Sequence, residues 1–85
     1  MKHQSHPAII ARLKRAEGHL RSVIAMLAEN RPCLDVAQQM HAVEAAISSA
    51  KRELIHDHID HCLDGGGEPS AAGLIGKLKQ ISKYL

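Results

Sequence analysis

Apolar residues recur along this chain at alternating spacings of four and three, the repeat by which amphipathic helices pack in coiled coils. The first stripe consists of Ile9, Leu13, Ala16, Leu20, Val23 and Leu27. The second consists of Val36, Met40, Val43, Ile47, Ala50 and Leu54. The pattern predicts two long helices whose stripes form the hydrophobic core.

Prolines and glycines set the expected limits of the helices. Pro7 suits the first turn of a helix, and Ser5 is a candidate cap before it. Pro32 interrupts the apolar pattern, and Ser70 can cap a third, short helix after a glycine-rich stretch. We therefore expect one all-α domain over residues 1–85, with helices at about 7–30, 32–63 and 70–84 and a linker at 64–69.

The chain has 85 residues and one aromatic side chain, Tyr84, so its core is small for its surface. Two long helices joined by a short turn would form an antiparallel hairpin with apolar surface left to cover. A second copy would cover it by completing a four-helix bundle. We expect a homo-oligomer, either a dimer or a dimer of dimers.

The net charge of +2 hides an uneven distribution along the chain. Residues 1–33 hold six Lys or Arg against two Asp or Glu, whereas residues 34–64 hold two against six. No apolar run approaches the roughly 20 residues of a membrane span, and the first residues do not form a secretory signal. We expect a cytoplasmic protein without a membrane partner, in which cysteines stay reduced.

A metal site is indicated by three residues in the second helix. His58 and Cys62 are four residues apart, so they stand on one face of a helix and can bind one ion. Cys33 lies 25 residues before His58, which is about 37 Å along a helix. One chain cannot bring all three together, but an antiparallel partner places its Cys33 beside them.

The donor set narrows the choice of metal. The positive end of a helix favours the thiolate form of a cysteine placed there, as expected for Cys33. Two thiolates and an imidazole suit Cu(I), and with further ligands Ni(II) or Zn(II). His3 is a candidate fourth ligand, which would favour Ni(II) or Co(II).

Three segments together resemble the CsoR/RcnR family of bacterial metal-sensing repressors: Arg-Leu-Lys-Arg-Ala-Glu-Gly-His-Leu at 12–20, Arg-Pro-Cys-Leu-Asp-Val-Ala-Gln-Gln at 31–39 and His-Asp-His-Ile-Asp-His-Cys at 56–62. The resemblance implies a tetramer, built as a dimer of dimers, that binds operator DNA without metal and releases it when metal binds. It also implies that Cys33, His58 and Cys62 are the ligands.

The chain departs from the copper-sensing branch of that family at two places. Pro32 precedes Cys33 where the copper branch has a tyrosine, and the third-helix segment at 71–78 has no carboxylate to contact the ligand histidine. These departures favour Ni(II) or Co(II) slightly over Cu(I). The formaldehyde-responsive branch also resembles the chain around Cys33, but it carries a proline where Lys2 stands.

No segment resembles a helix-turn-helix, so contacts with double-stranded DNA are expected to go to phosphates and to read DNA shape. The family's helix-one arginine falls on Arg12, which is the first candidate for such a contact. The candidate DNA-binding residues are Arg12, Lys14, Arg15, Arg21, Lys51 and Arg52.

Two other functions remain open. Cys33 and Cys62 of neighbouring chains could sense an oxidant or an electrophile such as formaldehyde. A helical interaction module without a ligand is the other alternative. The sequence contains no phosphate-binding loop, nucleophile elbow or HExxH motif, so an enzyme is not expected.

Overall fold

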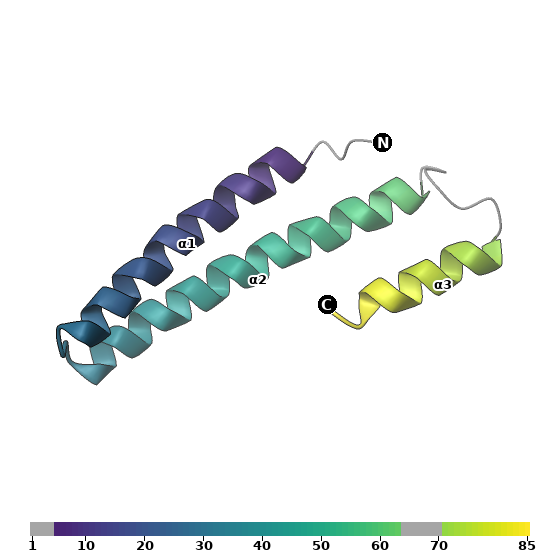
Figure 1. Ribbon diagram of the computed structural model, residues 1–85. Helices are drawn as coiled ribbons and strands as arrows, with labels where there is room; N and C mark the ends of the chain where they lie inside the picture. The colour runs from purple at the N-terminus through teal and green to yellow at the C-terminus, as the bar shows by residue number, and fades with distance from the viewer. Residues whose placement is uncertain (1–4, 64–70) are drawn as a thin grey trace.

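Three helices form a flat layer in the computed structural model, which describes residues 5–63 and 71–85, the side chains of 62 and 63 excepted. The helices are α1 (His6–Ala28), α2 (Cys33–Leu63) and α3 (Ala71–Ser82). α1 and α2 form a long antiparallel hairpin, and α3 folds back along the far end of α2 (Figure 1). The molecule measures 55 × 23 × 13 Å, so it is about one helix thick. The described residues contain no strand, and the expected all-α class is confirmed.

Only every second residue of each apolar stripe is buried within the chain. On α1 these are Ile9, Ala16 and Val23, and on α2 they are Val36, Val43 and Ala50. The alternate members remain 41–57% exposed: Leu13, Leu20, Leu27, Met40, Ile47 and Leu54. Within the single chain each predicted stripe is thus only half buried, and the other half is the apolar surface that the hairpin was expected to leave uncovered. In a layer one helix thick, the second row of side chains has no neighbouring element to cover it.

The turn after α1 explains why that helix ends at Ala28 rather than near residue 30. Asn30 has a φ of 56°, a left-handed conformation that asparagine tolerates better than most residues. The Arg31 N–H donates to Met26 O at 3.0 Å and the Asn30 N–H to Leu27 O at 3.1 Å. This pair of bonds is the Schellman motif, which satisfies the last carbonyls of a helix.

The start of α1 has no side-chain cap. The Ser5 hydroxyl makes no capping bond, and its oxygen is buried without a hydrogen-bond partner among the described residues. The predicted Ser5 cap is therefore wrong, because Ser5 itself has helical backbone angles (φ −81°, ψ −14°), whereas a cap residue is extended. The Val36 N–H donates to Pro32 O at 3.1 Å, which makes Cys33 the first residue of α2.

α3 is shorter than expected, ending at Ser82, and the chain continues in a tighter turn in which Tyr84 N–H donates to Ile81 O. The expected linker at 64–69 and the Ser70 cap lie outside the described residues. None of the described helices combines the length and the apolar content that crossing a membrane requires.

Candidate functional site

Cys33 lies at the closed end of the hairpin, where α2 begins. Its thiol is free and exposed. Asp35 is the acidic residue in the same first turn, a position where negative charge stabilises a helix. The thiol is thus accessible to an ion or to another chain from outside the hairpin.

His58 lies at the other end of α2, half-buried against α3. It shares a pocket with Lys77, Gln80, Ile81 and Tyr84. α3 and the turn after it therefore reach the candidate ligand with an amine, an amide and a phenol. Cys62 belongs to the last turn of α2, and its side chain lies outside the described part.

Cys33 and His58 are separated by 25 residues of uninterrupted helix, or about 37 Å. Among the described side chains, those of residues 5–61 and 71–85, no three His, Cys, Asp or Glu gather as a metal-binding group. Any site that joins Cys33 to His58 therefore needs a second chain.

The start of α1 contributes a further histidine to the His58 end of the molecule. His6 Nε2 lies 3.7 Å from Asp57 Oδ2, and the two side chains are 44% and 19% exposed. This contact ties the first turn of α1 to the residue next to His58. His3, the candidate fourth ligand, lies outside the described residues.

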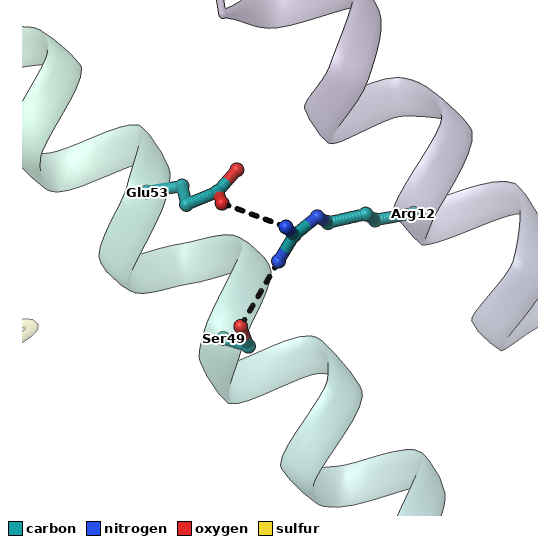
Figure 2. Close-up of polar contacts among 3 residues, drawn as sticks. All are labelled: Arg12, Ser49 and Glu53. Atoms are coloured by element: carbon teal, nitrogen blue, oxygen red, sulfur yellow. Dashed lines mark hydrogen bonds and ion pairs between the residues drawn. The ribbon is translucent and has the colours of Figure 1, made fainter.

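Two of the candidate DNA-binding arginines meet at one pocket between α1 and α2. Arg12 and Arg15 line it together with His19 and Ser49, and its volume is about 240 Å³. Arg12 reaches across to α2 with both ends of its guanidinium (Figure 2). Its Nη1 donates to Ser49 Oγ at 3.2 Å, and its Nη2 lies 3.0 Å from Glu53 Oε1.

The other candidate DNA-binding residues lie elsewhere on the single chain. Lys14 lines a hollow with Ile10 and Leu13. Arg21 follows Arg12 by nine residues, or about two and a half turns, and pairs with Glu17 at 3.8 Å. A different pocket on α2 takes in Lys51 and Arg52. Among the candidate DNA-binding residues, two arginines thus share one pocket and the other basic side chains are dispersed over the chain.

The sequence did not indicate the polar residues that join the two helices. His19 Nε2 donates to Gln39 Oε1 at 2.7 Å, and Arg12 binds Ser49 and Glu53 as described. Ser49 and Glu53 are four residues apart, so they share one face of α2. That spacing is visible in the sequence, but its pairing with Arg12 depends on the hairpin register.

Comparisons with known proteins place the chain in a family. Residues 5–85 match the family model described as metal-sensitive transcriptional repressor. The copper-sensing transcriptional repressor CsoR of Mycobacterium ulcerans is 38% identical over 77 residues, covering 85% of this chain and 66% of that protein. CsoR of Bacillus subtilis is 35% identical over 80 residues, covering 88% of this chain and 79% of that protein.

The chain spans just under two thirds of the length of the mycobacterial CsoR proteins. Among solved structures, the nickel-responsive transcriptional regulator InrS superposes with a TM-score of 0.85 at 32% identity, covering 100% of this chain and 98% of that one. The family match, the relatives and the shared three-helix fold agree, and the chain belongs to the CsoR/RcnR family of metal-sensitive transcriptional repressors.

Proposed function

We propose that this chain is the subunit of a cytoplasmic repressor that binds operator DNA without metal and releases it when a transition metal binds between two subunits. The observation that carries the proposal is the row of exposed apolar side chains on α2. Met40, Ile47 and Leu54 repeat every seven residues, so they share one face of the helix. Cys33 precedes Met40 by seven residues and His58 follows Leu54 by four, which extends the same face to both ends of α2.

A second copy packed antiparallel on this face would unite the candidate ligands. Cys33 lies fourteen residues before Ile47, the middle of the exposed row, and His61 lies fourteen after it. If a two-fold axis passes at Ile47 and relates two antiparallel α2 helices, Cys33 of one chain lies opposite position 61 of the other. Position 61 lies between His58 and Cys62 of that second chain. Burial of the apolar row would supply the association energy, at about 25 cal/mol per Å² of apolar surface.

The donor set suits a metal of intermediate or soft character. Thiolates of Cys33 and Cys62 with the His58 imidazole fit Ni(II), Co(II) or Cu(I). We place Ni(II) and Co(II) slightly ahead, because α3 offers His58 no carboxylate and because His3 is available as a further ligand. The relatives support both choices: the CsoR proteins are named for copper sensing and InrS for nickel.

The DNA contacts would come from the basic side chains, led by Arg12 and Arg15 at their shared pocket. Two hairpins joined as a four-helix bundle, and two such bundles joined as a tetramer, would repeat this site over a longer surface. Metal binding would draw the ends of two antiparallel α2 helices together and bias the assembly away from the DNA-binding arrangement. Such coupling between two sites typically amounts to about 1–3 kcal/mol and acts reciprocally.

The shared site can be tested by mixing two inactive variants. Homodimers of Cys33→Ala and of His58→Ala should each lack the thiolate-to-Ni(II) charge-transfer absorption band that reports a complete site. A mixed dimer retains one complete site, made from Cys33 of the His58→Ala chain and His58 of the Cys33→Ala chain. Return of about half the wild-type absorption would support a site between chains, and no return in mixed dimers isolated through two affinity tags would contradict it.

A thiol sensor is the alternative function, because the exposed Cys33 thiol is accessible to an oxidant or an electrophile. A thiol sensor would form a disulfide between Cys33 and Cys62 of neighbouring chains, or a formaldehyde adduct at Cys33. Mass spectrometry of the denatured, unreduced protein after mild oxidation distinguishes the two functions. Release of DNA together with a covalent dimer, and no release by metals, would favour the thiol sensor.

A further inference from the structure

Arg12 is held by two side chains of its own subunit at the place where a DNA phosphate would bind. Glu53 takes one terminal nitrogen at 3.0 Å and Ser49 takes the other at 3.2 Å (Figure 2). Both contacts come from one face of α2. A phosphate that approaches Arg12 must therefore replace or repel the Glu53 carboxylate.

The Arg12–Glu53 pair is weak enough to open. The two side chains are 45% and 38% exposed, so water and salt screen their attraction. An ion pair of this kind lowers the fraction of chains whose Arg12 is free to bind a phosphate. The observed affinity for DNA is the intrinsic affinity multiplied by that fraction. The neighbouring Arg15 has no ion pair or hydrogen bond within the described ranges, so of the two arginines at this pocket only Arg12 is restrained in this way.

We propose that Glu53 competes with DNA phosphate for Arg12 and thereby weakens operator binding. The inference rests on the proposed DNA-binding function and adds a residue that regulates the same site. Ser49 has a different role: it is neutral, it bonds the other nitrogen and it can hold the guanidinium in place while a phosphate replaces Glu53. Glu53 thus sets the affinity and Ser49 the orientation of Arg12.

Glu53→Gln tests the competition with little change in shape. It removes the charge and keeps a hydrogen-bonding oxygen. Fluorescence anisotropy of the full-length, reduced, metal-free protein with a promoter duplex, at low ionic strength, should show about two- to fivefold tighter binding for each Arg12 engaged. Glu29→Gln is the matched control, because it makes the same charge change at the opposite end of α1 and should leave the affinity unchanged.

The effect must also depend on Arg12. In an Arg12→Ala background, Glu53→Gln should no longer tighten binding. An equal gain in both backgrounds would show a general field effect and overturn the proposal, as would unchanged or weaker binding by Glu53→Gln alone. Circular dichroism of each variant checks that helix content is retained. If neither the wild type nor any variant binds DNA, the proposed repressor function itself is contradicted. That outcome differs from DNA binding that is the same with and without the Glu53 charge, which contradicts only the competition.

Discussion

At the scale of single residues, the proposed function depends on a few side chains whose partners lie on the opposite helix. Arg12 is the clearest, because its 37-residue separation from Ser49 is closed by the hairpin. His19 is similar, because it bonds Gln39 across the hairpin. One histidine thus joins the two helices by a hydrogen bond, and Arg12 and Arg15 line a shared pocket.

Arg12→Ala should weaken DNA binding and reduce its salt dependence. Removing one phosphate interaction makes the slope of log K against log salt concentration shallower by about one. Anisotropy titrations across a range of salt concentrations measure that slope. Arg31→Ala, at the hairpin turn, is the control with the same change of charge. Equal changes in slope for both variants would mean that Arg12 is not a specific contact.

At the scale of helices, periodicity and prolines predicted the elements well, and local chemistry moved only their ends. The stripe spacing identified α1 and α2, and the glycine-rich stretch separated α3. The sequence could not show which half of each stripe packs inside the hairpin, because both halves repeat every seven residues. Nor could it predict that Glu53 lies opposite Arg12, since that depends on how the helices align. The candidate metal ligands were predicted from spacing and family resemblance, and in the proposed site their geometry depends on a second chain.

The turn after α1 should be sensitive to what stands at position 30. Asn30→Gly should keep or raise stability, because glycine adopts positive φ without strain. Asn30→Val should lower the free energy of unfolding by about 1–2 kcal/mol, because a branched side chain is strained there. Urea denaturation followed by circular dichroism measures both. Equal stability of the two variants would show that the left-handed residue is not a determinant of the turn.

At the scale of the whole molecule, the exposed half of the stripes is the dominant feature. A layer 13 Å thick cannot enclose both rows of apolar side chains. The second row includes Leu20 and Ile47, 45% and 46% exposed, in the middle of the hairpin. Covering this row with another copy would both stabilise the fold and assemble the proposed metal site.

Ile47→Glu should therefore break the assembly as well as metal binding. It places a charge at the proposed two-fold axis, where it would face its own copy without a partner, and buried unpaired charges are strongly unfavourable. Sedimentation velocity should show a shift to smaller species. Lys83→Glu, near the end of the chain, is a control for added negative charge. An unchanged sedimentation coefficient for Ile47→Glu would show that the subunits meet through another surface.

In the proposed function, one metal ion bound through His58 controls the release of DNA. The most direct measurement is an anisotropy titration of a promoter fragment with reduced, metal-free protein, followed by Ni(II), Co(II) and Cu(I) in separate samples. We predict tight binding without metal and release by one of these ions, with Ni(II) or Co(II) ahead, and loss of that release in His58→Ala. DNA binding that none of the three metals reverses, or release that persists unchanged in His58→Ala, would contradict the account.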